Sequence, residues 1–234
     1  MSDTVQAIET RAAALSSRLR ELFPAGALAA ELCGSADPAA LYPEEARHVQ
    51  KAVPRRAAEF AAGRLCARLL LAELGLTRFA LEVGAHRQPL WPAKVVGSIT
   101  HTTGFCAAVA ARAPGLRALG IDSEIAGSVK TELWRGICTH AEASWLRSLP
   151  KDEQRAAATL IFSAKEAFYK CQFALTQEHL GFHDVSIELP AWGGGRRGAF
   201  QVRANRGIRL GSAGALQGQY LFHEEFITTG MALG

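Results

Sequence analysis

One segment constrains the fold more than any other: residues 152–175 carry the apolar stripe of a long amphipathic helix. The stripe recurs at intervals of four and three residues and consists of Ala157, Ile161, Ala164, Phe168, Cys171 and Leu175. This spacing places every member on one helical face. Pro150 interrupts the chain just before the pattern begins. We therefore predict a long helix that must pack its stripe against another element.

A second helix and several strands complete the predicted secondary structure. Residues 55–74 lie between Pro54 and Gly75 and keep apolar residues at helical spacing, and a shorter helix is predicted over 140–149. β-rich segments bounded by turn residues predict strands over 79–83, 95–100, 105–111, 118–123, 185–189, 200–203, 208–210 and 220–223, with a closing hairpin at 226–231. Residues 112–117, with Pro114 and Gly115, read as a connector between two helix-and-strand sets.

Composition excludes several classes of protein. Of 234 residues, 49% are hydrophobic and 21% charged, which is typical of a folded globular chain. Apolar runs fall far short of the ~20 residues that span a bilayer, so we expect no membrane span. The five cysteines are odd in number and dispersed, which fits neither a disulfide framework nor a zinc site. Asp3 and Glu9 do not suit a secretory signal, so we expect a cytoplasmic protein. The net charge of +4 favours acidic partners or phosphates.

Two acids stand at the end of an apolar predicted strand. Asp122 and Glu124 flank Ser123, and residues two apart on a strand point to the same face. Carboxylates so placed can hold a hard cation that also keeps water or phosphate oxygens. Two solvated acids at a strand end would show the same pattern.

The long helix carries a second polar pair. Glu166 and Lys170 are four residues apart, on the face turned away from the apolar stripe. An ordinary surface pair would stabilise the helix by about 0.2–0.5 kcal/mol. Phe162 and Phe173 fall on the same face, however, and two phenylalanines are unusual on a solvated surface. The pattern therefore favours a partly enclosed cleft.

Basic residues gather on the other predicted helix. Arg56 and Arg64 are eight residues apart, hence about 80° apart around the axis, and both could reach one anionic ligand. Solvated arginines are the alternative. The predicted strand that ends in Thr100 and His101 adds polar groups, although an isolated histidine is commonly structural.

In this order and spacing, these segments resemble the 4′-phosphopantetheinyl transferases of the surfactin and enterobactin type. The strings that carry the resemblance are RRAAEFAAGR from Arg55, PLWP from Pro89, VGSITH from Val96, LGIDSE from Leu119 and FSAKEAFYK from Phe162. LGF at residues 180–182 lies where the family often has the same residues. The resemblance covers about residues 55–182, and the first fifty residues and the C-terminal strands add little to it.

The resemblance implies a role for each matching position. The implied ligands of Mg²⁺, for which Mn²⁺ can substitute, are Asp122, Glu124 and Glu166. The implied contacts to the phosphates of coenzyme A, including the 3′-phosphate, are Arg56, Arg64, Arg87, Thr100, His101, Lys165 and Lys170. Ser123 stands where the family often has an apolar residue, and we expect its side chain to point away from the metal. We predict that Glu166, or a metal-bound water it holds, removes the serine proton while Lys170 and Mg²⁺ balance charge on the leaving phosphate.

The resemblance also implies an architecture, a reaction and partners. The fold would be α+β, a pseudo-two-fold pair of halves over 1–114 and 115–234, each a long helix on an antiparallel sheet. The reaction would attach the phosphopantetheine arm of coenzyme A to a serine of an apo acyl or peptidyl carrier protein. We expect a monomer that binds no nucleic acid. Residues 127–145, with Lys130, Trp134 and Arg135, are our hypothesis for the carrier surface.

Two other functions remain as alternatives. A Mg²⁺-dependent nuclease or phosphohydrolase would use the acids with water as nucleophile. Such nucleases commonly place a lysine two residues after a metal-binding acid, whereas Glu124 is followed by Ile125 and Ala126. The non-enzymatic alternative is an RNA- or anion-binding module built on Arg196, Arg197, Arg203, Arg206 and Arg209, although Phe200 is the only aromatic platform beside them.

Overall fold

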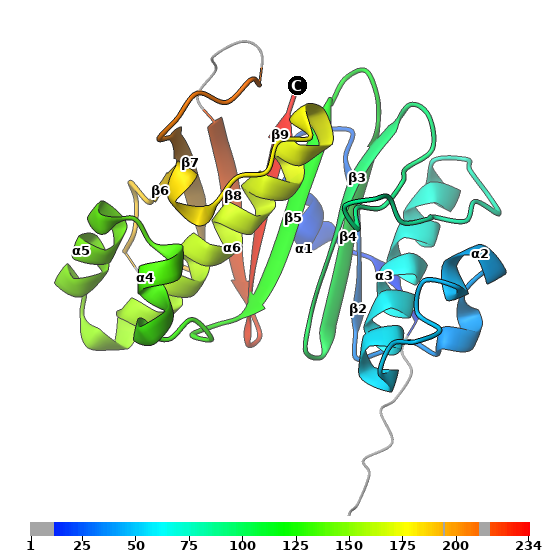
Figure 1. Cartoon of the computed structure of the whole chain (residues 1–234), viewed down its shortest axis with the longest axis horizontal. Coiled ribbons are helices and arrows are strands. Elements are labelled where there is room, and N and C mark those ends of the chain that lie inside the picture. The colour runs from blue at the N-terminus through cyan, green and yellow to red at the C-terminus, as the bar shows by residue number, and fades with distance from the viewer. Residues whose placement is uncertain (1–11, 194, 211–215) are drawn as a thin grey trace, which may run out of the picture.

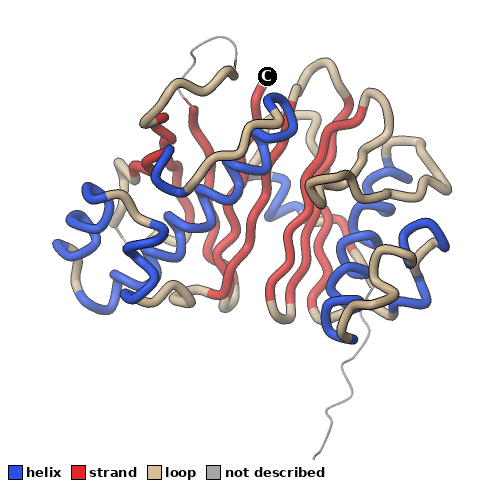
Figure 2. The backbone as a smooth tube through the Cα atoms, in the orientation of Figure 1, coloured by secondary structure: helices blue, strands red, loops and turns tan. Residues whose placement is uncertain are grey.

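The chain folds around two antiparallel sheets that lie side by side, each covered by one long helix (Figures 1 and 2). The computed structural model describes residues 12–193, 195–210 and 216–234. Its four-stranded sheet has the order β1-β2-β4-β3, and its five-stranded sheet has the order β5-β9-β8-β7-β6. The predicted α+β class with two helix-on-sheet halves is confirmed.

The first sheet and its helix come from the N-terminal half of the chain. Its strands are β1 (Ala14–Leu15), β2 (Leu28–Cys33), β3 (Val95–Thr102) and β4 (Phe105–Arg112). The helices are α1 (Ser17–Arg20), α2 (Pro43–Ala46) and α3 (Pro54–Glu73), with a 3₁₀ turn η1 (Pro38–Ala40). Pro54 begins α3 because proline is tolerated in the first helical turn. The small residues Ala61, Ala62 and Cys66 of α3 pack on this sheet.

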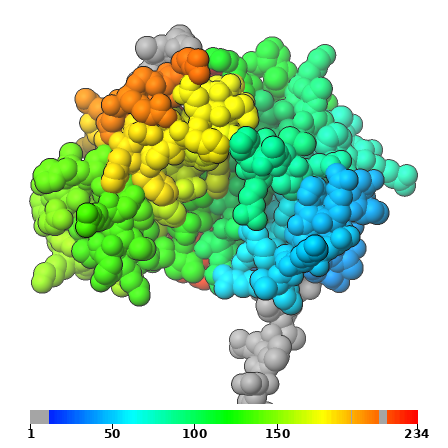
Figure 3. Space-filling view, viewed as in Figure 1, coloured from blue at the N-terminus to red at the C-terminus, as the bar shows by residue number. Residues whose placement is uncertain are grey.

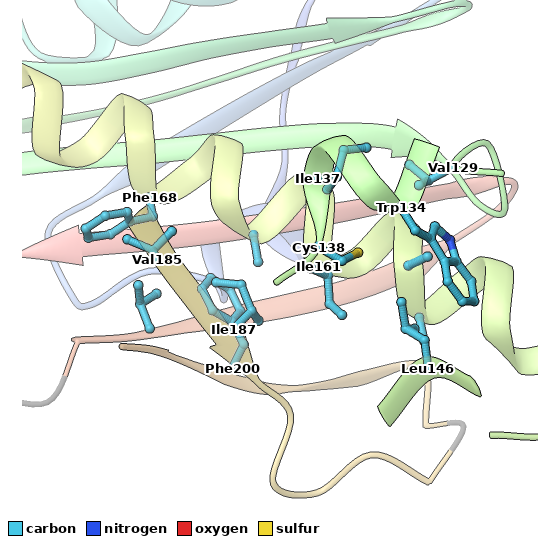
Figure 4. Packing of buried hydrophobic residues seen from close by; sticks show 14 of the residues in the cluster. Val129, Trp134, Ile137, Cys138, Leu146, Ile161, Phe168, Val185, Ile187 and Phe200 are labelled. Carbon is cyan, nitrogen blue, oxygen red and sulfur yellow. The ribbon is translucent and has the colours of Figure 1, made fainter. Parts of the chain in front are cut away.

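The second sheet and its helices follow residues 113–117. Its strands are β5 (Ala118–Ile125), β6 (Val185–Glu188), β7 (Arg197–Ala204), β8 (Leu216–His223) and β9 (Phe226–Leu233). The helices are α4 (Trp134–Ile137), α5 (His140–Ser148) and α6 (Lys151–Thr176), with 3₁₀ turns η2 (Thr131–Leu133) and η3 (Phe182–Asp184). The predicted stripe of α6 faces the core, where Ile161 and Phe168 lie near Val185 and Phe200 (Figure 4).

A glycine lets α6 approach β5 closely. A Cβ built on Gly120 would lie 1.9 Å from the carbonyl oxygen of Ala167 and 2.9 Å from Cβ of Cys171. Only a residue without a side chain fits that gap. Since alternate strand residues share a face, Gly120, Asp122 and Glu124 all face the α6 side. The glycine of the LGIDSE string therefore sets the separation between the acids on β5 and Glu166 on α6.

Side chains join the two sheets where edge strands β3 and β5 run next to each other. The Ile121 amide donates to Oγ of Ser98 at 3.2 Å, and the Ser123 amide donates to Oγ1 of Thr100 at 2.9 Å. A shared apolar core lies behind these strands and includes Leu22 and Phe23, which follow α1. Sequence reasoning gave the first fifty residues no role. Their described part, from residue 12 on, supplies β1, β2 and part of the core between the halves.

Two predicted strands are absent from the described residues. Over 79–83 the structure shows only an isolated bridge between Val83 and Pro89. The backbone of Leu81 instead pairs with side chains, its amide with Oε1 of Glu45 and its carbonyl with Nε of Arg64. Residues 208–210 are irregular because the Leu210 amide bonds to the carbonyl of Ile208, two residues earlier. In the first segment bonds to distant side chains replace a strand ladder, and in the second a bond between neighbouring residues does so.

The remaining predicted elements agree with the structure to within a few residues. The helix predicted over 152–175 is α6, that over 55–74 is α3, and that over 140–149 is α5. Four of the five cysteines are buried as free thiols, and Cys33 is partly exposed. Among the described residues, no helix is long and apolar enough to cross a membrane.

Candidate active site

The site forms where α6 crosses β5 beside the junction with β3. Asp122 is buried, and its Oδ1 accepts hydrogen bonds from Nζ of Lys170 at 2.7 Å and from the Thr100 hydroxyl at 3.3 Å. Its second oxygen, Oδ2, is buried without a hydrogen-bond partner among the described residues. An unpaired buried carboxylate oxygen costs free energy unless a ligand satisfies it. One carboxylate oxygen of Asp122 is therefore fixed by two donors, and the other has no described partner.

The negative charge of Asp122 acts on two further acids, Glu124 and Glu166. Burial, followed by the negative charge of Asp122, raises the pKa of Glu124 to about 7. Burial also raises the pKa of Glu166, with Lys170 opposing the shift and Asp122 adding to it. Carboxylates that disfavour each other's charge are favoured by a neighbouring cation, and Lys170 is one such cation.

The donor set fits a hard divalent cation. Carboxylate oxygens are the ligands that Mg²⁺ and Mn²⁺ prefer, and the unpaired Oδ2 of Asp122 is one such oxygen. Within the described ranges, however, no three His, Cys, Asp or Glu side chains are already arranged around a single metal position. The three acids thus form a cluster that interacts electrostatically rather than a preformed cage. Their role as metal ligands stays a prediction.

The pair predicted on the outer face of α6 does line a cleft. Glu166 and Lys170 both border a cavity of about 490 Å³ between α6 and the segment 86–98. Phe173, also predicted for this face, lines the same cavity. On the visible surface, residues near 86–91 (teal) meet the C-terminal part of α6 (yellow) across this junction (Figure 3). His86 packs edge-on against Phe173 there, with ring centroids 5.4 Å apart.

A neighbouring cavity of about 330 Å³ collects the predicted basic residues. Arg56, Arg64, Arg87 and His101 line it together. Arg56 contacts the His101 ring, and burial together with the charge of Arg56 lowers the pKa of His101. Glu59 is the one carboxylate among the described lining residues. Several guanidinium donors around one cavity are suited to a phosphate-bearing ligand.

Arg64 is fixed in the wall of this cavity. Its Nε donates to the Leu81 carbonyl at 2.7 Å, and its guanidinium lies 4.1 Å from the centre of the Phe60 ring. Burial lowers the pKa of Arg64 to about 10, which leaves it charged at neutral pH. The terminal nitrogens are then the donors that remain for an anion.

Thr100 and Lys165, two of the implied phosphate contacts, bond to other parts of the protein in this structure. The Thr100 hydroxyl is buried and spans Asp122 and the Ser123 amide. Lys165 is 2% exposed, and its ammonium donates to Glu142, to the Ile137 carbonyl and to the Phe182 carbonyl. A lysine has three N–H donors, so its described partners already account for all of them. Ser123 points away from the acids, as expected, and bonds to Thr228 at 2.8 Å.

Sequence reasoning missed two buried acids, Glu45 and Glu142, that support the residues around the site. Glu45 accepts from the Tyr42 and Leu81 amides and pairs with Arg68 at 2.7 Å, which supports the wall that holds Arg64. Glu142 pairs with Lys165 at 2.7 Å. For Glu142, the local signal in the sequence was the Thr139-to-Glu142 spacing of a capping box. That spacing predicts a helix start and says nothing about a distant lysine.

The predicted carrier surface needs one correction. Trp134 is only 3% exposed and packs in the core beside Ile137 and Leu146 (Figure 4). Its neighbour Leu133 is 51% exposed, near the exposed Lys130 and Arg135. The tryptophan is buried because the short α4 turns its side chain towards α6 and α5.

The C-terminal arginines do not form an open basic platform. Three of them pair with acids: Arg203 with Glu188 at 2.5 Å, Arg206 with Asp184 at 3.1 Å, and Arg209 with Glu178 at 2.6 Å. Arg197 also pairs with Glu21. Arg196 donates to the Phe222 carbonyl. Because four of the five arginines already pair with an acid, this surface offers little support for the RNA-binding alternative.

Fold and site together define a two-halved α+β protein with a basic cavity beside an acidic cluster. The family model for the 4′-phosphopantetheinyl transferase N-terminal domain matches residues 44–111, and that for the 4′-phosphopantetheinyl transferase superfamily matches residues 118–220. The chain therefore belongs to the 4′-phosphopantetheinyl transferase family, which confirms the resemblance.

Relatives of known name agree with this assignment. 4′-Phosphopantetheinyl transferase Npt of Nocardia iowensis is 36% identical over 169 residues, 72% of this chain and 75% of that protein. 4′-Phosphopantetheinyl transferase Svp of Streptomyces mobaraensis is 40% identical over 150 residues, 64% of this chain and 61% of that protein. Enterobactin synthase component D of Escherichia coli K12 is 39% identical over 141 residues, 59% of this chain and 65% of that protein.

Proposed function

We propose that this protein transfers the 4′-phosphopantetheine group of coenzyme A to a serine hydroxyl of an apo acyl or peptidyl carrier protein. Adenosine 3′,5′-bisphosphate is the second product. One observation supports the proposal: three cavities lie next to one another, and each neighbouring pair shares lining residues. The basic cavity shares Arg87 and Pro89 with the cleft beside α6, and that cleft shares Glu166 and Tyr169 with a third cavity of about 150 Å³.

This series suits a long ligand with phosphates towards one end. The guanidiniums of Arg56, Arg64 and Arg87 would bind the phosphates on the adenosine side, with His101 as a further donor. The Lys170 ammonium would lie next to the diphosphate, because it already borders the central cavity beside Glu166. A Mg²⁺ or Mn²⁺ ion bound by Asp122, Glu124 and Glu166 would neutralise diphosphate charge and polarise its P–O bond.

The chain's own residues supply proton transfer and charge balance. Glu166 takes the proton from the carrier serine, directly or through a water it holds. The serine oxygen forms a bond to the β-phosphorus, and the bond from that phosphorus to the bridging oxygen breaks. The departing bisphosphate carries the electron pair of the broken bond, and Lys170 offsets its negative charge. The raised pKa of Glu166 makes its carboxylate a better proton acceptor than an exposed glutamate.

Intact-mass analysis of apo carrier proteins tests the proposal directly. A panel of carriers is incubated with the protein, coenzyme A and MgCl₂. We expect at least one carrier to gain the mass of a phosphopantetheinyl group, and a serine-to-alanine carrier serves as control. Release of phosphopantetheine without any carrier would instead favour the phosphohydrolase alternative.

The carrier surface is tested by charge reversal. Carrier proteins are typically acidic, so Lys130 and Arg135 should attract them. We expect the Lys130→Glu/Arg135→Glu variant to raise the carrier KM about 10-fold, with more effect at low salt. The Arg20→Glu/Lys94→Glu variant makes the same charge change on the other half. An unchanged carrier KM in the first variant would show that this surface is not used.

A further inference from the structure

The buried Lys165 ammonium is the centre of a hydrogen-bonded junction. It donates to Oε2 of Glu142 at 2.7 Å, to the Ile137 carbonyl at 2.9 Å and to the Phe182 carbonyl at 2.7 Å. These acceptors belong to the start of α5, the end of α4 and the 3₁₀ turn η3. One lysine of α6 thus holds three segments that are distant from it in sequence.

Glu142 extends the junction to a further strand. Its Oε1 accepts from the Ile187 amide of β6 at 2.7 Å, and its Oε2 accepts from the Thr139 amide at 2.6 Å. Its side chain is 4% exposed and that of Lys165 is 1% exposed. A buried ion pair gives little net stability compared with apolar residues of the same size, because both charges lose their water. It does fix the geometry of everything it bonds to.

The junction lies directly beside a proposed catalytic residue. Glu166 follows Lys165 on α6, and both line the 150 Å³ cavity. The opposite wall of that cavity includes Leu180, Gly181 and Phe182, and the last of these residues is tied to Lys165 through its carbonyl. The segment predicted to contact the carrier, 127–145, is attached to the same lysine through Ile137 and Glu142.

We propose that the Lys165–Glu142 pair is a positioning pair that holds the 180–182 wall and the carrier-contacting segment in register with Glu166. This inference rests on the proposed function. Lys165 acts through the backbone it binds and does not touch coenzyme A. The first lysine of FSAKEAFYK would thus orient the carrier serine, while Lys170 supplies charge.

The experiment removes the two charges separately and together. The variants are Lys165→Met, Glu142→Gln and the double variant, with Lys151→Met as the matched change at an exposed lysine of α6. Each single change leaves one buried charge unpaired and should lower the thermal midpoint strongly. The double variant leaves no unpaired charge and should regain most of that loss, so its activity can be measured on folded protein.

Three readouts on the double variant decide the question. We expect coenzyme A binding by calorimetry to stay within about threefold of wild type. We expect kcat/KM for the carrier to fall on the order of 10- to 100-fold, the usual consequence of small misplacement. We expect amide hydrogen exchange over 180–187 and 137–142 to quicken about 10-fold, with α3 unchanged.

Each contrary result overturns the inference in a different way. Full carrier activity in the double variant would show that the pair is merely structural. A 10-fold or greater loss of coenzyme A binding, with unchanged carrier KM, would show instead that Lys165 contacts a phosphate of coenzyme A. Unchanged exchange would refute the anchoring whatever the activity. An inactive wild type on the whole carrier panel would instead refute the proposed function itself.

Discussion

The Thr100 hydroxyl of β3 donates a hydrogen bond to Oδ1 of Asp122 on β5, so one half of the molecule orients an acid of the other. The same hydroxyl accepts from the Ser123 amide at 2.9 Å. The two bonds fix both the strand and the carboxylate, and Oδ2 of Asp122 is left without a described partner. The junction between the sheets is therefore part of the site.

Removing this hydroxyl should affect both stability and activity. Thr100→Val keeps the shape but leaves the buried Ser123 amide unpaired, so we expect the free energy of unfolding in urea to fall by about 1–3 kcal/mol. Transfer should slow because Asp122 loses a fixed donor. Thr100→Ser retains the hydroxyl and should recover most of both. Equal losses in the two variants would show that the methyl group, not the hydroxyl, is what matters.

Gly120 should not tolerate a side chain. Because a Cβ there would overlap the Ala167 carbonyl, Gly120→Ala must displace α6 from β5. We expect a loss of about 1–3 kcal/mol in the free energy of unfolding, typical of overpacking, together with slower transfer. Gly136→Ala is the matched control, since nothing lies within 4 Å of a Cβ there. Wild-type stability of Gly120→Ala would contradict the close approach.

Glu166 should be required for turnover but not for binding. Glu166→Gln keeps the size of the side chain and removes the proton acceptor, so kcat should fall at least about 100-fold, in the range of general-base catalysis. Coenzyme A should still bind, as measured by calorimetry. The exposed Glu73→Gln on α3 serves as control. Near-normal turnover of Glu166→Gln would remove this residue from the mechanism.

The basic cavity should recognise a phosphate that coenzyme A has and dephospho-coenzyme A lacks. We expect Arg56→Gln to weaken coenzyme A binding about 10-fold, by loss of a charge-assisted hydrogen bond. Binding of dephospho-coenzyme A should change little. Arg55→Gln is the control, because Arg55 bonds to Glu59 and Thr103 and does not line the cavity. If both ligands weaken equally, Arg56 does not contact the 3′-phosphate.

Protons should compete with the metal at Glu124. Its pKa is raised from 4.5 to about 7, so below pH 7 the carboxyl is largely protonated and must release a proton to bind a cation. The Mg²⁺ concentration for half-maximal activity should therefore rise up to about 10-fold per pH unit below pH 7 and level off above it. Glu124→Gln should flatten this dependence. A wild-type profile that is already flat would exclude Glu124 as a ligand.

The raised pKa of Glu124 also predicts how the stability of the metal-free protein depends on pH. A carboxyl whose folded pKa exceeds its unfolded pKa favours folding below the unfolded value. Its contribution is present below pH 4.5 and is lost as the pH rises through about 7. The metal-free wild type should therefore lose stability across that window relative to Glu124→Gln, in urea titrations at successive pH values. Saturating Mg²⁺ should reduce the difference.

Local patterns predicted the long helices, whose hydrogen bonds stay within themselves, and most of the strands. The stripe through Ile161 and Phe168 predicted α6, because a helix satisfies its own backbone and only its apolar face needs a partner. The segment 79–83 has the composition of a strand, yet the backbone of Leu81 is satisfied by the side chains of Glu45 and Arg64. Such bonds join residues that no short window contains together.

The site likewise depends partly on local patterns and partly on long-range contacts. The sequence by itself singled out Asp122, Glu166 and Lys170 as candidate site residues, from strand alternation, helical spacing and the motifs of the family. Only the tertiary structure decided that Lys165 pairs with Glu142 inside the core whereas Lys170 reaches Asp122. Neighbouring lysines on one helix look alike in sequence. Their roles diverge because packing brings a buried acid to one and leaves the other at the cleft.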